Sequence, residues 1–471
     1  MSSPPLSIAV VGHTNTGKTS LMRTLLRAPR FGEVSEQSAT TRHVQRAVLV
    51  LDGATLELYD TPGLERSIEL MEHLEARAAD RRVEGVQRIE RFLASEAAGG
   101  GFAQEAKVLR QVMRSDVALY VVDVRDPMRA KHRDELTALS WCARPIVPVL
   151  NFVKSPEVSV EPWRQGLRRV GLHTIAEFDA VVRDVSSERQ LLNKIASVLD
   201  EHADTLATVA RVRMREHDEL VREASQLIAE LLVDVAAYVT HAQSGDAAAQ
   251  REATQRLRNE VRTREQRCVD RLFELFGFDA CTYESEALPL EGGRWGLDLF
   301  SPEATRRFGA WTGGAAATGA AVGLALDLAA AGVTLGTGTA IGAATGAALG
   351  AGKAHGRRFM GWWHGYTELR CDDRTLRLLA SRQIALVREL LQRGHAALGP
   401  VSATIPDRLE GFDTLPRPLR TARGRAEWST LRRQDRYVPD DAGRTEAVDR
   451  LAGLIQPMLT AGASTEVEPS S

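Results

Sequence analysis

One short stretch near the N-terminus, Leu6 to Leu21, constrains the fold of this chain more than any other part. Its apolar, partly β-branched start is typical of a buried parallel strand. The strand pattern ends at Gly12, and from there to Thr19 the sequence fits Gly-x-x-x-x-Gly-Lys-Ser/Thr without a mismatch. A loop of this type leads from a strand into a helix. The stretch therefore predicts an α/β P-loop NTPase domain, with a mostly parallel sheet and helices on both faces.

The residue types of this loop match the chemistry of a bound triphosphate. Glycines allow backbone N–H groups to approach phosphate oxygens, and the next helix directs its positive N-terminus toward them. We expect Lys18 to contact the β- and γ-phosphates and to act in catalysis, and the Thr19 hydroxyl to bind Mg2+. The other expected nucleotide-binding residues of the loop are Gly12, His13, Thr14, Asn15, Thr16, Gly17 and Ser20.

A second motif follows about forty residues later. The runs Gln45 to Leu51 and Thr55 to Tyr59 are strand-like, and the Asp-Gly pair between them predicts a hairpin. The second run ends in Asp60-Thr61-Pro62-Gly63. We expect the Asp60 carboxylate to hold Mg2+ through water and the Gly63 N–H to contact a γ-phosphate.

Residues 6–64 resemble the Era/TrmE-type branch of bacterial GTPases. The resemblance rests on the segments GHTNTGKTSL, SATTRH and YDTPGL, in that order. It implies GTP and GDP as ligands with Mg2+, and it implies that Thr41 closes on Mg2+ and the γ-phosphate. Thr40 is the second choice for that role. Gly63 would anchor the segment known as switch II and take part in catalysis.

Two further residues bear on mechanism through this resemblance. Leu64 stands where many small GTPases have the glutamine that orients the attacking water, and a leucine side chain has no group that can do so. Asn15 matches the loop asparagine that helps to hold K+ in TrmE-like members, where the cation can replace an arginine finger. The alternative for Asn15 is a cap of the turn.

The base-recognition segment departs from the family pattern. Buried strands are predicted at Asp116 to Asp123 and Pro145 to Asn151, and the second leads into Asn151-Phe152-Val153-Lys154, where the family has Asn-Lys-x-Asp. We expect Asn151 and Phe152 to contact the base. Lys154 has no acceptor for the guanine N1–H and N2–H2 groups, so guanine and other bases both stay open.

The rest of the first half completes one domain, which we place at residues 1–205. Residues 65–115 are helical in composition and form an insertion with a glycine triplet at 99–101. The last strand is expected within Thr174 to Val182, and the final helix at Ser186 to Asp204.

Composition excludes some classes of protein. Lys and Arg total 60 against 62 Asp and Glu, and this balance gives no evidence of a specific nucleic-acid site. The four cysteines lie far apart, which argues against a disulfide framework or a zinc site and fits a reducing cytoplasm. The N-terminal residues lack the basic and apolar regions of a secretory signal.

The second half is mainly α-helical, and we divide it into a helical region at 206–300, a Gly/Ala-rich region at 301–370 and a C-terminal helical region with a tail at 371–471. Long helices are expected at Thr208 to His241, Asp246 to Phe276 and Arg374 to Leu398, with a shorter one at Thr445 to Leu459. Their charged residues are expected on solvated faces. The layout resembles a bacterial group in which an Era-like domain precedes an uncharacterised helical domain.

One segment of this half raises the question of a membrane. More than half of the residues from Gly309 to Gly352 are Gly or Ala, Asp327 is the only charge, and both flanks are basic. Small residues at every fourth position allow helices to pack closely, as they do in bilayers. A hairpin that contacts inner-membrane lipid and a soluble helical hairpin are both consistent with this pattern.

These features lead to one functional hypothesis and two alternatives. The hypothesis is a GTP-hydrolysing switch in the cytoplasm, attached to the inner face of the cytoplasmic membrane, with a protein partner of unknown identity and a homodimer as a further option. The alternatives are a nucleotide-binding regulatory module with little turnover and an ATP-using P-loop protein.

Overall fold

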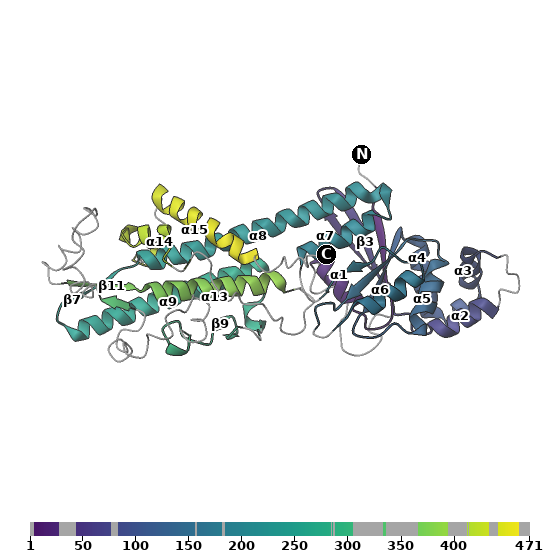
Figure 1. Ribbon diagram of the computed structural model, residues 1–471, viewed down its shortest axis with the longest axis horizontal. Coiled ribbons are helices and arrows are strands. Elements are labelled where there is room, and N and C mark those ends of the chain that lie inside the picture. Colours follow the sequence, from purple (N-terminus) through teal and green to yellow (C-terminus); the bar gives the residue numbers. More distant parts are fainter. Residues whose placement is uncertain are drawn as a thin grey trace, which may run out of the picture. The chain divides into compact units, whose positions relative to one another are not determined.

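The structure is a computed structural model of the chain (Figure 1). It describes residues 4–27, 44–76, 83–155, 158–180, 184–283, 285, 288–304, 333–335, 366–393, 412, 414–432 and 441–460. Contacts between residues divide the chain into two compact units. The first consists of Met1–His217 with 392–398, and the second of Asp218–Leu391 with 399–471. The division falls inside helix α8 (Ala203–Ala237), whereas the sequence placed a boundary near 205.

A six-stranded sheet forms the centre of the first unit. Its strand order is β2-β3-β1-β4-β5-β6, and all neighbours are parallel except the β2–β3 pair. The strands are β1 (Leu6–Val11), β2 (Gln45–Leu51), β3 (Ala54–Asp60), β4 (Val117–Asp123), β5 (Ile146–Asn151) and β6 (Ala176–Glu177). The expected mostly parallel α/β sheet is therefore confirmed.

The hairpin predicted from the Asp-Gly pair is present. Asp52 and Gly53 have φ angles of 48° and 80°, which are the left-handed values that a two-residue hairpin turn of type I′ requires. The turn sets a register in which Gln45 lies opposite Asp60. This register places the end of β3 beside β1, from which the phosphate-binding loop leaves the sheet.

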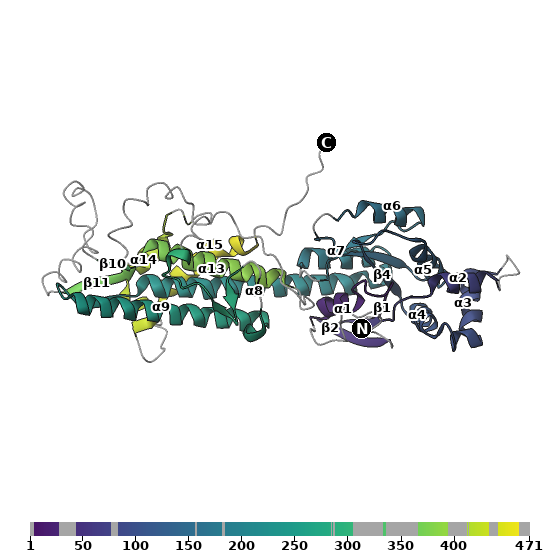
Figure 2. The same cartoon turned by 90° about the horizontal axis from the view of Figure 1, so that it is seen from below.

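Helices cover both faces of this sheet, as Figure 2 also shows. Ile8 and Val10 of β1 face one core and Ala9 and Val11 face the other, as expected for successive residues of a strand. The first core contains α1 (Lys18–Leu26), α7 (Val185–Ala196) and the start of α8. The second contains α2 (Ser67–Ala76), α3 (Gly85–Leu93), α4 (Ala103–Arg114), α5 (Ala130–Ser140) and α6 (Glu161–Arg169).

The segment between β3 and β4 contains three of these helices. It runs through α2 and α3, a short 3-10 turn at Glu96–Ala98, and α4. Gly99–Gly101 make the bend between that turn and α4, and the Gly101 carbonyl accepts a hydrogen bond from the Arg66 guanidinium (2.9 Å). This bond ties the start of the segment to its middle.

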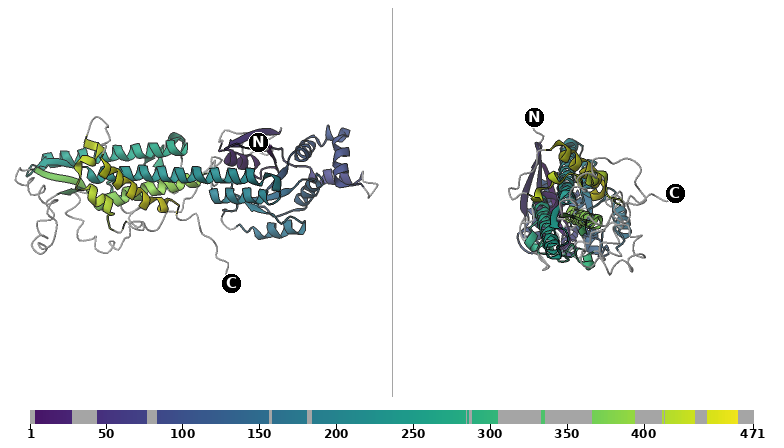
Figure 3. Two further views of the ribbon diagram at one scale, coloured as in Figure 1. Left: turned by 90° about the horizontal axis from the view of Figure 1, so that it is seen from above. Right: turned by 90° about the vertical axis from the view of Figure 1, so that its left-hand side faces the viewer.

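The second unit is built on long helices that lie side by side in Figure 3. They are the remainder of α8, α9 (Ala247–Phe276), α13 (Asp373–Gln392) and α15 (Ala442–Thr460), with a short α14 (Arg417–Ala422). All contribute to one hydrophobic core. Two small antiparallel sheets complete the unit, β10-β11-β7 and β8-β9; their strands are β7 (Thr240–Gln243), β8 (Leu290–Glu291), β9 (Arg294–Trp295), β10 (Val333–Leu335) and β11 (Tyr366–Cys371).

Several charges that the sequence placed on solvated faces are buried in this unit, so that expectation is wrong for them. Asp234 is 1% exposed and accepts hydrogen bonds from Arg264 (2.8 Å), Arg444 (3.2 Å) and the Thr430 hydroxyl (3.0 Å). The reason is that charged residues on one helix are covered by another helix that supplies opposite charge, which is how buried ions are tolerated.

The proposed Gly309–Gly352 hairpin lies outside the described residues apart from Val333–Leu335. Those three residues form β10, which pairs with β11, instead of a helix. Among the residues that the structure describes, every helix falls short of the combined length and apolar character that crossing a bilayer requires.

Candidate nucleotide-binding site

The loop between β1 and α1 has a backbone that only glycine can adopt at two positions. Gly12 and Gly17 have φ angles of 141° and 88°. A Cβ at Gly12 would lie 2.4 Å from the Val121 carbonyl oxygen, and one at Gly17 would lie 2.3 Å from the Asn151 side-chain nitrogen. Close packing against β4 and β5 therefore explains both glycines, and it places the loop at the carboxyl end of the sheet.

Lys18 is the first residue of α1, and its ammonium group folds back over the loop. The Nζ donates hydrogen bonds to the carbonyl oxygens of His13 (2.7 Å) and Gly12 (3.2 Å), and the residue is 7% exposed. Burial lowers the pKa of Lys18 from 10.5 to about 8, although the nearby carboxylates, Asp60 first, act in the opposite direction. A phosphate group at the loop would supply negative charge that favours the protonated form of Lys18.

The residues expected to hold Mg2+ lie together. Thr19 Oγ1 donates a hydrogen bond to Asp60 Oδ2 over 2.6 Å, and Asp60 is fully buried. The other carboxylate oxygen, Oδ1, is buried and has no hydrogen-bond partner among the described residues. Burial raises the pKa of Asp60 above its usual value. A hydroxyl and an unsatisfied carboxylate oxygen are ligands that a hard divalent cation prefers, so these residues fit Mg2+.

The Asp60–Gly63 segment packs against the phosphate-binding loop. A Cβ at Gly63 would lie 2.2 Å from Thr14 Oγ1, and the next residue, Leu64, donates its N–H to the Gly12 carbonyl (3.4 Å). The Leu64 side chain is fully buried in the core that contains α2 to α6. It therefore faces away from any bound phosphate.

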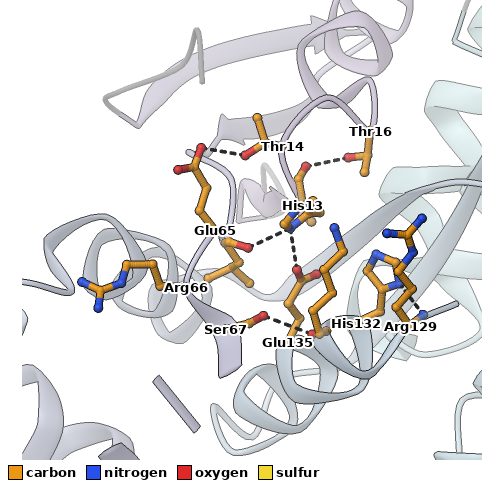
Figure 4. A network of polar contacts seen from close by, with 12 residues as sticks. His13, Thr14, Thr16, Glu65, Arg66, Ser67, Arg129, His132 and Glu135 are labelled. Carbon is orange, nitrogen blue, oxygen red and sulfur yellow. Dashed lines mark hydrogen bonds and ion pairs between the residues drawn. The ribbon is translucent and has the colours of Figure 1, made fainter. Parts of the chain in front are cut away.

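His13 has a role that the sequence did not suggest. We expected it in the nucleotide-binding loop, and its ring is directed toward Glu135 (Figure 4) and also contacts the Leu64 carbonyl. The Nδ1 lies 2.9 Å from both the Leu64 carbonyl and Glu135 Oε1, so it is the donor to these acceptors. Glu135 is fully buried and also accepts from the Tyr120 hydroxyl (2.6 Å). The network joins the loop, the segment after β3, and α5.

Figure 4 also shows two side chains next to this network. The Thr14 hydroxyl donates to Glu65 (2.9 Å), a second connection between the loop and the segment after β3. The His132 ring accepts from the Arg129 N–H (3.0 Å), and burial lowers its pKa to about 4, so it is neutral at physiological pH. No spacing in the sequence indicates the contact of Thr14 with Glu65, because the two residues lie far apart in the chain, whereas Arg129 and His132 are close neighbours at the start of α5.

The remaining predicted residues of the loop are placed as follows. Asn15 has a left-handed φ of 64°, and Ser20 is half-buried in the first turn of α1. The Thr16 hydroxyl donates to the His13 carbonyl (3.0 Å), which closes the loop. Thr40 and Thr41 lie outside the described residues, so their expected contact with Mg2+ stays a prediction.

Asn151 joins three loops at the end of the sheet where the base is expected. Its Nδ2 donates to the Thr16 carbonyl (2.9 Å), and its Oδ1 accepts from the N–H groups of Phe152 and Ala180 (2.9 Å each). Asn151 is fully buried. Its side chain thus holds the phosphate-binding loop beside the loops that follow β5 and β6, while the Phe152 ring lies 3.9 Å below the Arg125 guanidinium.

Comparisons with known proteins agree with this arrangement. Residues 7–152 match the family described as "50S ribosome-binding GTPase". Residues 164–453, more than half of the chain, match the family described as "Domain of unknown function (DUF3482)".

Curated relatives match the first part of the chain. The tRNA modification GTPase MnmE of Helicobacter acinonychis is 25% identical over 163 residues, which cover 34% of this chain and 30% of MnmE. GTPase Der of Herpetosiphon aurantiacus is 26% identical over 217 residues, 45% of this chain and 43% of Der. The matched region thus spans less than half of either relative. Era of Aquifex aeolicus bound to GDP.AlF4- is a solved structure at 15% identity; the match covers 58% of this chain and 90% of Era with a TM-score of 0.29.

Proposed function

Since this chain belongs to the family described as "Domain of unknown function (DUF3482)" and carries a bacterial P-loop GTPase domain before that region, we propose that it binds GTP and hydrolyses it to GDP and phosphate, with Mg2+ as cofactor. MnmE and Der, to which its first part is similar, are named GTPases. The observation that carries the proposal is the Thr19–Asp60 pair, with its buried unsatisfied oxygen, directly beside the buried ammonium of Lys18.

In hydrolysis, a water oxygen attacks the γ-phosphorus while the bond from that phosphorus to the bridging oxygen of GDP breaks. Negative charge develops on the bridging and γ-phosphate oxygens. Lys18 and the loop N–H groups can stabilise this charge because they are held in place before the reaction, and Lys18 is also buried. Mg2+ bound by Thr19, and through water by Asp60, would add positive charge at the same oxygens.

The group that orients the attacking water is not Leu64. Its side chain is apolar and fully buried. A second candidate function that fits this observation is a nucleotide-binding regulatory module with little turnover. Single-turnover hydrolysis of GTP separates the two, because a regulatory module would bind GTP tightly and convert almost none of it.

The proposed activity is tested by titrating the full chain with fluorescent GTP, ATP and XTP in the presence of Mg2+. We expect tighter binding of GTP than of ATP, and release of phosphate from GTP. Lys18→Ala should abolish binding, whereas Lys194→Ala, which removes an exposed lysine of α7, should leave it unchanged. A preference for ATP, or phosphate release that persists in Lys18→Ala, would refute the GTPase proposal.

We further propose that GTP acts as a switch. Thr41 would close on the γ-phosphate, and the change would pass to the helical half and to a protein partner.

A role of Asn15 in K+ binding is part of the proposal. Activity that is the same in K+ and Na+ buffers would exclude this role.

The Gly309–Gly352 segment is proposed to bring the protein to lipid at the inner face of the cytoplasmic membrane. Its basic flanks and small-residue spacing support this. Fractionation of cells that express the full chain or a variant without 309–352 tests the membrane proposal, and an equal soluble fraction of the two proteins would refute it.

Light scattering with GDP and with a GTP analogue would reveal a homodimer.

A further inference from the structure

We propose that Asp179, in the loop after β6, is the carboxylate that recognises guanine in this protein, in place of the acceptor that is missing at Lys154. The inference rests on the proposed function, because it concerns which base the same site selects. Guanine presents two adjacent donors, N1–H and N2–H2, on one edge. A site that selects guanine therefore needs an acceptor that faces them, and a carboxylate is the side chain that supplies two acceptor oxygens.

The topology shows where the base end of the site lies. The phosphate-binding loop follows β1, and in parallel sheets ligands bind beyond the carboxyl ends of the strands. From β1 the strand order continues through β4 and β5 to β6. Asn151 connects the loops along this direction, since it bonds to Thr16 in the first loop and to Ala180 after β6. A nucleotide with its phosphates at Lys18 would extend its base toward the loops that follow β5 and β6.

Lys154 is at this edge of the sheet, and its ammonium group is directed toward Asp184. The Nζ lies 3.6 Å from Asp184 Oδ2, and the side chain is 50% exposed. Asp184 caps the N-terminus of α7, where it accepts hydrogen bonds from Ser186 N (2.9 Å) and the Ser187 hydroxyl (2.9 Å). The ammonium is thus held at the start of α7, and what Lys154 presents to the neighbouring loop is its backbone N–H.

That backbone N–H donates to Asp179. The distance from Lys154 N to Asp179 Oδ2 is 3.2 Å, and Asp179 is 7% exposed. Lys154, which stands where the family pattern has an aspartate, is therefore in direct contact with a carboxylate from the loop after β6. A carboxylate accepts about four hydrogen bonds, so the bond from Lys154 does not by itself prevent Asp179 from accepting others. Asp179 thus has the chemistry to accept from guanine at the place where Lys154 does not.

Two other acids near this edge have contacts away from the backbone of Lys154. Asp123 forms a bidentate ion pair with Arg125, in which Nε lies 2.9 Å from Oδ1 and an Nη lies 2.6 Å from Oδ2. The Arg125 guanidinium also stacks on Phe152. Asp184 is the cap described above. Among the described residues, Asp179 is a buried carboxylate in contact with the base-recognition segment, so its removal should change base preference.

The test changes a donor or acceptor on the side chain of residue 179 and the matching donor or acceptor on the base. Asp179→Asn replaces one acceptor with a donor, and xanthine carries an acceptor oxygen where guanine carries its amino group. We expect the wild-type chain to bind fluorescent GTP more tightly than XTP. In Asp179→Asn the affinity for GTP should fall by about 10- to 100-fold, the value of a hydrogen bond to a charged group, and the affinity for XTP should rise.

Asp126→Asn is the matched control, because Asp126 is an exposed acid of the loop after β4, and it should leave the ratio of GTP to XTP affinity unchanged. The inference is wrong if Asp179→Asn keeps the wild-type ratio, or if both affinities fall together, since Asp179 would then only support the loop of Lys154. A wild-type chain that prefers ATP would instead refute the proposed function itself.

Discussion

Nucleotide binding by this protein should be coupled to the uptake of a proton by Lys18. The ammonium group is buried, and its pKa is lowered to about 8 by that burial. A bound triphosphate brings negative charge next to Nζ and favours the charged form. The pKa should therefore rise on binding, and above pH 8 a proton must be taken up from solvent. Binding should weaken as the pH increases through this range.

The magnitude follows from the two pKa values. Near pH 9 an amine with a pKa of about 8 carries its proton in about one tenth of the molecules. If the phosphates restore the ordinary pKa of 10.5, almost every bound molecule is protonated, and binding takes up about 0.9 proton. The affinity should then be about tenfold weaker near pH 9 than near pH 7. The terminal phosphate loses its last proton near pH 6, well below this range.

Calorimetry in two buffers with different ionisation enthalpies measures the proton uptake directly. Lys194→Ala, at an exposed position of α7, is expected to keep the wild-type uptake. Lys18→Arg carries a guanidinium that stays protonated, so any binding that it retains should lack the uptake. The reasoning fails if the wild-type affinity is the same near pH 7 and pH 9, or if proton uptake persists in Lys18→Arg.

Three more predictions concern the site and the helical unit. Gly17→Ala should weaken GTP binding at least about tenfold, because its Cβ would lie 2.3 Å from Asn151 Nδ2 on a left-handed backbone; equal affinity in a titration contradicts this. Asp60→Asn should remove most of the Mg2+ dependence of binding. In the wild type, protonation of Asp60 on acidification should also remove the Mg2+ dependence of binding, because a protonated carboxyl is no longer a metal ligand. Burial raises the pKa of Asp60, so this loss should occur at a higher pH than for an ordinary aspartate. Mg2+ titrations of the wild type and of Asp60→Asn from about pH 4 to pH 8 measure both effects. Asp234→Ala should lower the free energy of unfolding by about 3–5 kcal/mol in urea denaturation because the buried Arg444 and the half-buried Arg264 lose their carboxylate, whereas Asp449→Ala, at an exposed site, should change it by less than about 0.5 kcal/mol.

Local patterns predicted the elements of the first unit well. The strand before Gly12, the hairpin at Asp52-Gly53 and the strands that end at Asp123 and Asn151 are all present at the expected places. Each of these predictions depends on residues within one element or one turn. The hydrophobic run, the glycines and the turn residues act on the backbone next to them, so the sequence carries the information directly.

In the helical unit, local patterns did not predict which charged residues are buried. The periodicity of α8 and α9 identified both helices, but it could not show that Asp234 and Glu265 are covered by other helices. Glu265 is 5% exposed and pairs with Arg382, which is fully buried and stacks on Trp295. An apolar stripe in the sequence identifies one buried face of a helix. It does not show whether a helix from a distant part of the chain buries a second, charged face.

The phosphate-binding loop of Gly12 to Thr19 was thus determined by the sequence alone, because strand, glycines, lysine and helix are consecutive and act over a few residues. The surroundings of that loop were decided by the tertiary structure. His13 contacts Glu135, Asn151 holds Thr16, and Asp179 accepts from the backbone of Lys154 only because the strand order brings the ends of β1, β4, β5 and β6 to one edge. The sequence contains each of these residues, and no spacing rule relates them, since the sheet sets distances between segments that the chain separates.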